Sequence, residues 1–252
     1  MSIQFSEACK DLFKTENKWM TILGLSVCML IPIVGPMVIF GFLFRRFARE
    51  RQGHPAEDFD FNFFADYLKM GLWPVLASLV FGLLIIPVIL VFAVFSAVVI
   101  PLAENGNEAL LVIIGIIGFL LYLILIFVFS VLSYAVILRS GLMMNFSSGF
   151  SWSFMKSFLG KVGLSFLGYT LLLTLIAIPL VLIGYLALLV GAYVVAAWLQ
   201  FVMMHLTYQH YDLMVERGGE KIEVNPELTK TLDNPPLPTP PELPEKEQET
   251  TD

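Results

Sequence analysis

The sequence predicts an all-α membrane protein, because apolar residues dominate, charges are rare, and long stretches of the chain hold no charge at all. Of the 252 residues, 58% are hydrophobic and 14% are charged. Residues 71–103, 109–138 and 162–211 contain no charged side chain. A soluble domain of this size would place charges on every helix. About 20 apolar residues suffice to cross a bilayer, and these runs are too long for barrel strands. We therefore expect a polytopic helical bundle with four long transmembrane helices.

Residues 1–218 are predicted to form a membrane domain, and the charge-free runs indicate where its transmembrane helices lie. The four transmembrane helices are predicted at 70–101, 109–138, 162–183 and 187–211. Amphipathic helices that lie in the membrane interface are predicted at 3–16, 58–68 and 150–159. In the first of these, apolar residues fall on one helical face, which is expected to place its aromatic edge at the acyl boundary.

An internal repeat organises the same elements. Each of two aromatic trios, spaced by four residues, precedes a Lys-x-Gly and then an Ile-Pro on the following helix. The trios are Phe59, Phe63, Tyr67 and Phe150, Phe154, Phe158, and the prolines are Pro87 and Pro179. Phe5, Cys9 and Phe13 form a weaker third copy. Since broken helices in repeated units can mark transport sites, Pro87 and Pro179 are candidate helix-break or gating positions.

Residues 19–47 are predicted to form a broken helix pair. Pro32 and Pro36, with Gly35 between them, interrupt an α-helix. If this segment crossed the membrane once, the lysines before it would lie outside, against the positive-inside rule. A re-entrant hairpin places these lysines inside, whereas one kinked span with an external N-terminus is the alternative. Pro32 and Pro36 are also candidate helix-break or gating positions.

The C-terminal end differs in composition from the rest. Residues 1–211 carry 11 basic and 10 acidic side chains, whereas residues 212–252 carry 4 basic and 11 acidic ones. Residues 219–252 are rich in proline and glutamate, a composition that buries too little surface to fold. We therefore predict a disordered cytoplasmic tail, which serves either as a solvated spacer or as a docking segment for a protein partner.

Candidate chemistry is sparse. Cys9 and Cys28 form neither a disulfide framework nor a metal spacing. Gln200, His205 and His210 are the strongest polar candidates in the last span, but their spacings of five do not share one helical face. Hydroxyl side chains within the spans, such as those of Tyr134 and Thr174, are expected to bond between helices. No catalytic, cofactor or metal site is predicted, and we do not expect an enzyme.

The basic segment 45–51 is the best binding candidate. It follows a membrane helix, where anionic lipid attracts each basic residue by about 1 kcal/mol. Its four arginines are candidate contacts for lipid head groups, with topology anchoring as the simpler role: Arg45, Arg46, Arg49 and Arg51. A nucleic-acid partner is not expected, because no basic domain lies outside the membrane. Small residues such as Gly115 and Gly118 serve helix packing or homo-oligomer formation.

The N-terminal third resembles an uncharacterised family of prokaryotic multi-pass membrane proteins, a domain of unknown function numbered four-thousand-thirteen. The resemblance covers about residues 5–95. It departs from the family pattern at Phe42, where a tyrosine is usual, and at His54, where a leucine usually precedes the proline. The residues that carry it are Trp19, the run from Ile31 to Pro36, Gly41, Arg45, Arg46, Gly53, the Phe-rich stretch 59–67 and Gly71. The resemblance implies a prokaryotic plasma membrane and no known activity.

Two functions are consistent with the sequence. The first is a non-enzymatic membrane component that binds lipid or a partner protein. The second is a permease or channel for a neutral or amphipathic solute, which would move at the repeat interface. By the positive-inside rule, the basic segments and the C-terminus are expected in the cytoplasm.

Overall fold

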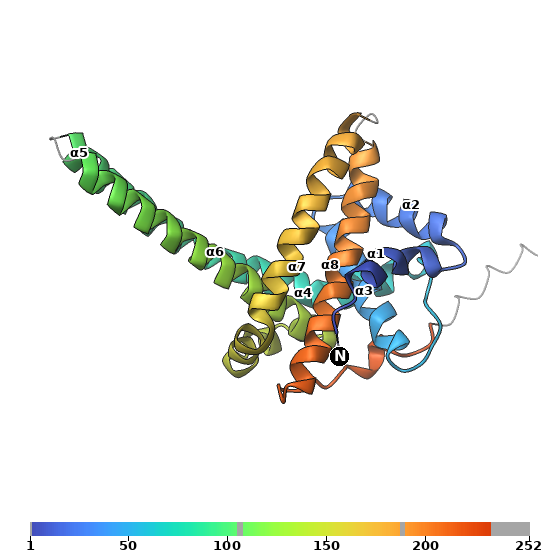
Figure 1. Cartoon of the computed structure of the whole chain (residues 1–252). Coiled ribbons are helices and arrows are strands. Elements are labelled where there is room, and N and C mark those ends of the chain that lie inside the picture. Colours follow the sequence, from blue (N-terminus) through green and yellow to red (C-terminus); the bar gives the residue numbers. More distant parts are fainter. Residues whose placement is uncertain (1, 105–107, 187–189, 233–252) are drawn as a thin grey trace, which may run out of the picture.

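The computed structural model describes residues 2–104, 108–186 and 190–232, and in these residues the chain is helical without strands (Figure 1). The α-helices are α1 (Phe5–Asp11), α2 (Lys18–Met29), α3 (Val34–Glu50), α4 (Phe64–Leu83), α5 (Ile85–Glu104), α6 (Glu108–Met143), α7 (Trp152–Leu186) and α8 (Val190–Glu216). The short 3₁₀ turns are η1 (Leu12–Lys14), η2 (Phe61–Phe63), η3 (Ser147–Phe150) and η4 (Pro226–Leu228).

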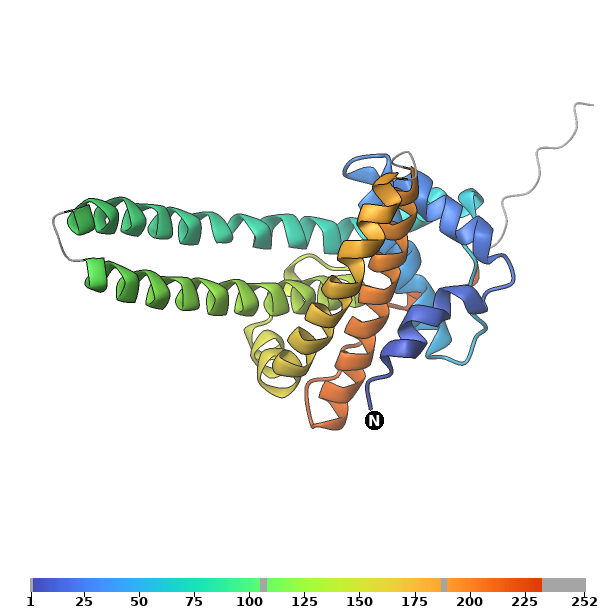
Figure 2. The same cartoon turned by 45° about the horizontal axis from the view of Figure 1, so that its top comes forward.

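Four apolar segments are long enough to cross a membrane: Phe61–Phe95, Val112–Met143, Trp152–Leu186 and Val190–Glu216. They confirm the prediction of four long transmembrane helices in an all-α bundle. Figure 2 shows them as two hairpins, α5 with α6 and α7 with α8. The outer part of the first hairpin extends away from the other helices. We call residues 85–95 and 112–126, the described side chains of that extension, the arm.

The chain breaks between α2 and α3, in the Pro-Gly-Pro region. Pro32 cannot donate a backbone hydrogen bond, and Ile33 adopts a left-handed φ of 68° that a β-branched residue rarely takes. Gly35 lies so close to α2 that a Cβ there would come within 1.8 Å of the Cys28 carbonyl oxygen. Pro36 stands in the first turn of α3, where a missing N–H costs nothing. With 12 residues, α2 is about 18 Å long.

Two of the three predicted interfacial helices are not separate elements. The predicted helix 150–159 is the start of α7, which runs without interruption from Trp152 to Leu186. The predicted helix 58–68 becomes η2 followed by the first turns of α4. In both places the prediction was wrong because no proline or turn sequence separates the aromatic trio from the apolar run that follows.

The N-terminal helix α1 packs on the protein with its apolar face. Ala8 and Leu12 are fully buried, and the Phe5 ring stacks on Tyr169 of α7 at 6.1 Å between centroids. The indole nitrogen of Trp198 donates to the carbonyl oxygen of Cys9 at 3.3 Å. The expectation that this aromatic edge enters the acyl boundary is therefore corrected for Phe5, whereas Phe13 is 45% exposed.

The segment 219–232 corrects the predicted boundary of the disordered tail. It crosses the ends of the helices as a strap, with Ile222 and Leu228 buried. Its backbone is tied down at Ile222, which donates to the Tyr211 hydroxyl at 2.8 Å, and at Asn225, which donates to the Leu142 carbonyl at 2.8 Å. Residues 233–252 of the predicted tail lie outside the described residues.

Helices α3 and α4 approach closely through two glycines. A Cβ on Gly41 would lie 1.8 Å from the Tyr67 carbonyl oxygen, and one on Gly71 would lie 1.7 Å from the Met37 carbonyl oxygen. Only hydrogen fits at either position, as is common where membrane helices meet.

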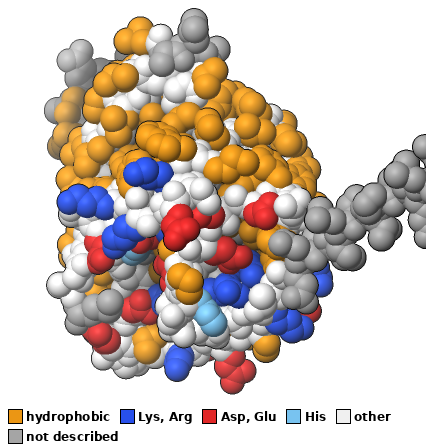
Figure 3. Space-filling view, turned by 90° about the vertical axis from the view of Figure 1, so that its right-hand side faces the viewer, with side chains coloured by type: hydrophobic (Ala, Val, Ile, Leu, Met, Phe, Trp, Pro, Cys, Tyr) orange, Lys and Arg blue, Asp and Glu red, His pale blue; other side chains and the backbone are white. Residues whose placement is uncertain are grey.

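Charged and apolar side chains separate into two zones of the surface. In Figure 3 the upper half is almost wholly hydrophobic, and the Lys, Arg, Asp and Glu side chains gather in the lower half. The lower zone, which we call the charged end, holds the C-terminal ends of α3 and α8 and the strap (Figure 1). The apolar zone is the part that a bilayer would surround.

Candidate functional site

Two arginines of α3 are buried at the charged end. Arg45 and Arg46 are 1% and 0% exposed. The Nε of Arg45 lies 2.9 Å from a carboxylate oxygen of Glu57, and its Nη1 donates to the Lys230 carbonyl of the strap at 2.7 Å. Arg46 contacts Glu50 at 2.9 Å and Asp11 at 3.2 Å. Buried charges persist only when they are paired in this way.

This burial corrects the expectation that Arg45 and Arg46 contact lipid head groups. Their guanidinium groups join α1, α3, the loop at Glu57 and the strap, so their role is to hold the charged end together. Arg49 also turns inward, because its Nη1 donates to the carbonyls of Thr229 and Lys230 at 3.3 and 3.2 Å. Arg51 is the most accessible of the four, with 31% of its side chain exposed.

The carboxylates around Arg46 shift in opposite directions. Burial opposes ionisation of Asp11, but the nearby His205 imidazole and the charges of Arg46 and Lys14 outweigh it, so the pKa of Asp11 is lowered. Burial dominates at Glu50 and raises its pKa, although Arg46 partly compensates. Both carboxylates pair with the buried guanidinium of Arg46.

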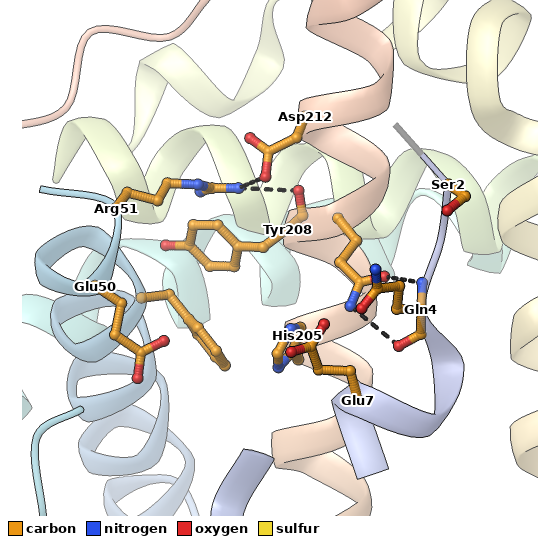
Figure 4. A pocket seen from close by; sticks show the side chains of 10 residues that line it. Ser2, Gln4, Glu7, Glu50, Arg51, His205, Tyr208 and Asp212 are labelled. Carbon is orange, nitrogen blue, oxygen red and sulfur yellow. Dashed lines mark hydrogen bonds and ion pairs between the residues drawn. The ribbon is translucent and has the colours of Figure 1, made fainter. Parts of the chain in front are cut away.

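A cavity of about 240 Å³ lies next to this network, between α1, α3 and α8 (Figure 4). On one side, Arg51 bonds the Asp212 carboxylate and the Tyr208 carbonyl, and its guanidinium carbon lies 4.3 Å from the Tyr208 ring centroid. On another side, the Gln4 backbone exchanges two hydrogen bonds with the Gln209 amide. Because these groups already bond one another, the cavity offers few free polar groups to a ligand.

The three polar candidates of α8 have separate environments. His205 faces Asp11, with 3.4 Å between Nδ1 and the carboxylate oxygen. His210 bonds the Leu206 carbonyl through Nδ1 at 2.7 Å and lies 3.3 Å from the Ser165 hydroxyl through Nε2. The His210 ring is fully buried against the edges of Phe166 and Tyr169. The pair links α7 to α8.

Gln200 lines a groove of about 350 Å³ along the α7–α8 hairpin. One wall is α7, with Thr170, Leu173, Thr174 and Ala177, and the other is α8, with Ala196, Leu199, Gln200 and Met203; Tyr134 of α6 and Met29 of α2 complete the lining. All ten lining residues are uncharged. The groove opens on the surface of the bundle that faces lipid, since Thr174 is exposed and Ala177 half-buried.

The polar groups of this groove differ in whether they are satisfied. The hydroxyls of Thr170 and Thr174 donate to carbonyls of their own helix, those of Phe166 and Thr170, both at 2.8 Å. By contrast, neither the Gln200 amide nor the Tyr134 hydroxyl makes a hydrogen bond to any residue in the described part of the chain. The expectation of bonds between helices is therefore wrong for Tyr134 and Thr174.

The proline candidates lie away from the groove. Pro87 and Pro179 are both exposed. Helix α7 continues through Pro179. The helical segment that contains Pro87 is interrupted at Leu84, between α4 and α5, which is three residues before the proline. An unpredicted proline, Pro74, lies buried inside α4.

Sequence reasoning singled out Gln200 but missed its neighbours. An amide within a charge-free span was a usable signal. Tyr134 was expected to bond between helices and not to line a groove, because the groove forms only where residues of three helices meet. The sequence indicated the burial of Arg45 and Arg46 only weakly, through the presence of carboxylates that could pair with them, at Asp11, Glu50 and Glu57.

Four apolar spans with a charged end define a polytopic integral membrane protein. Residues 24–192 match the family described as "Protein of unknown function (DUF4013)". Because this match covers more than half of the chain, the protein belongs to that family, as the resemblance implied. The match reaches beyond the N-terminal third to α7 and the start of α8. No curated protein and no solved structure matches the chain.

Proposed function

We propose that this protein is a non-enzymatic membrane component that binds a lipid-like molecule in the groove between α6, α7 and α8. The observation that carries the proposal is the pair of unsatisfied polar groups, the Gln200 amide and the Tyr134 hydroxyl, in an otherwise apolar groove. A polar group in an apolar medium without a partner costs about 1–3 kcal/mol. A ligand that bonds both groups would remove this cost.

Binding without catalysis is favoured by the chemistry of the lining. The groove has no ionisable acid or base besides the Tyr134 phenol, and a general acid or base needs a group that titrates near the working pH. In the nearby Ser165 and His210 pair, the histidine ring is buried against Phe166 and Tyr169 and both of its nitrogens already have partners. Pro87 and Pro179 lie outside the groove, so the proposal includes no gating by these residues.

The charged end supports a cytoplasmic orientation for that side of the molecule. Basic residues from distant parts of the chain meet there: Arg139 bonds Glu220 at 2.6 Å, and Lys161 and Arg217 each bond the other's carbonyl. By the positive-inside rule we place this end in the cytoplasm of a prokaryote. A protein partner for the tail and a homo-oligomer remain predictions from the sequence.

The proposal is tested by filling the groove. Ala177→Phe places a ring between α7 and α8, and Ala93→Phe makes the same change on the exposed surface of the arm. Each protein would be purified in native lipid particles, and its lipids quantified against the parent membrane. We expect one lipid class to be enriched with the unsubstituted protein and with Ala93→Phe, but not with Ala177→Phe. Equal lipid profiles for all three proteins would contradict the proposal.

A further inference from the structure

We infer that the ligand of the groove is an uncharged lipid whose hydroxyl, carbonyl or amide group lies deep in the hydrocarbon core, rather than a phospholipid held by its head group. This inference rests on the proposed function and names the ligand class of the same site. It follows from the depth of the Gln200 amide, from the bonding capacity of the two unsatisfied groups and from the shape of the surface beside them.

The depth is set by the positions along the helices. Gln200 lies ten residues after the start of α8 at Val190 and twelve before Asp212, which is about 15 and 18 Å along the axis. On the facing wall, Thr174 lies thirteen residues after Lys161, about 20 Å. The hydrocarbon layer is about 30 Å thick, so the Gln200 amide lies near its middle.

A charged head group does not fit at that depth. No lysine, arginine or histidine lines the groove, and an unpaired charge in the bilayer interior is strongly unfavourable. A phosphate would have to leave the interface to reach Gln200. An ionised fatty acid would likewise find no counter-ion. The polar group that reaches Gln200 is therefore uncharged.

The bonding capacity of the groove favours an oxygen function. The Gln200 amide offers two hydrogens and an acceptor oxygen, and the Tyr134 hydroxyl offers one hydrogen and an acceptor oxygen. The hydrogens of Thr170 and Thr174 are already used within α7. A carbonyl oxygen can accept a hydrogen bond from either group, and a hydroxyl can in addition donate to the amide oxygen.

The surface beside the groove accommodates an apolar chain. A volume of about 350 Å³ holds a polar group and only part of a long-chain lipid. Along α7, Leu171, Leu175 and Ile178 are more than half exposed. A long-chain alcohol, amide or quinone would place its oxygen in the groove and its chain along this face.

The inference is tested with three photoreactive probes that carry the same diazirine-labelled chain: hexadecanol, hexadecanoate at alkaline pH, and a phosphatidylcholine. The protein would be reconstituted in lipid particles and crosslinked, and the labelled peptides of α7, α8 and the arm quantified by mass spectrometry. Gln200→Leu and Tyr134→Phe remove the two unsatisfied groups. Ser78→Ala is the control, because the Ser78 hydroxyl bonds the Val75 carbonyl within α4, away from the groove.

We expect the hexadecanol probe to label the α7 and α8 peptides most strongly. Gln200→Leu should reduce this labelling by about five- to tenfold, the loss expected for one hydrogen bond. Ser78→Ala should leave it unchanged. If Gln200→Leu fails to fold, competition replaces it: unlabelled hexadecanol should reduce the labelling, and unlabelled hexadecanoate should not.

Two other results would overturn the inference and can be told apart. Stronger groove labelling by phosphatidylcholine or hexadecanoate would refute the uncharged class and leave the proposed function standing. Labelling of the groove peptides no stronger than that of the arm, for every probe, would refute the proposed function itself.

Discussion

The arm and the α7–α8 hairpin are both pairs of long apolar helices, yet they differ in what they present to their surroundings. Along the arm, Val91, Val94 and Val112 are 60–68% exposed, and its described side chains carry few polar groups. The α7–α8 hairpin carries the Ser165–His210 bond and an amide, Gln200, beside a groove. Hydropathy identifies both hairpins as spans, but among the described side chains the second carries more of the polar groups that lipid hydrocarbon cannot satisfy.

Polar groups that persist inside apolar segments are therefore the places where we look for function in such a chain. The two regions also differ in the interactions that stabilise them. The body of the molecule, meaning the described residues outside the arm, depends on paired charges and close backbone contacts. The arm depends on contact between its own two helices and the surrounding lipid. Substitutions in the body should therefore have larger effects than equal changes in the arm.

The largest effect is expected for Arg46→Leu. It would leave the buried Asp11 and the half-buried Glu50 without their guanidinium partner, and breaking a buried pair costs about 3–5 kcal/mol. Unfolding in a detergent titration would show the loss. Lys10→Leu is the control, because Lys10 is exposed and has no ion pair to any described residue. Equal stability of the two variants would show that the charged end does not organise the body.

A smaller loss is expected for Gly41→Val. The new side chain would clash with the Tyr67 carbonyl, so α3 and α4 would have to separate. Overpacking of this kind costs about 1–3 kcal/mol, with more where backbone must move. Thermal unfolding followed by size-exclusion chromatography would measure it. Gly115→Val is the control, since a Cβ there meets nothing within 4 Å.

Asp11→Asn should lower stability in a pH-dependent way. The folded pKa of Asp11 is lowered, so its stabilising contribution is present above the ordinary carboxyl value of about 4 and lost as the pH falls through the folded pKa. His205, Arg46 and Lys14 are the groups that face it. We expect a deficit of about 1–3 kcal/mol at neutral pH, which shrinks below pH about 4 in parallel melts. A deficit that persisted unchanged in acid would argue against an ionic role.

The smallest effect is expected in the arm. Ala93→Leu enlarges an exposed side chain on α5 without touching the body, and such surface changes usually stay within about 0.5 kcal/mol. The same detergent titration measures it. A loss as large as that of Gly41→Val would mean that the arm is packed against another protein surface.

The sequence predicted the bundle, the four spans and the helix break near Pro32, because the absence of charge and the two prolines act locally. It did not predict the burial of Arg45 and Arg46, since their partners Glu57, Asp11 and Lys230 come from distant segments. The strap was missed because two apolar residues, Ile222 and Leu228, are a weak signal in a polar segment. Gln200 was noticed as polar, but its groove exists only once α6, α7 and α8 meet.

Native mass spectrometry of protein ejected from lipid particles would show whether the groove holds one lipid-like molecule. We predict a single bound species at one copy per chain for the unsubstituted protein and for Ala93→Phe, and a bare chain for Ala177→Phe. A bare chain in all three samples, or the same bound species in Ala177→Phe, would contradict the account.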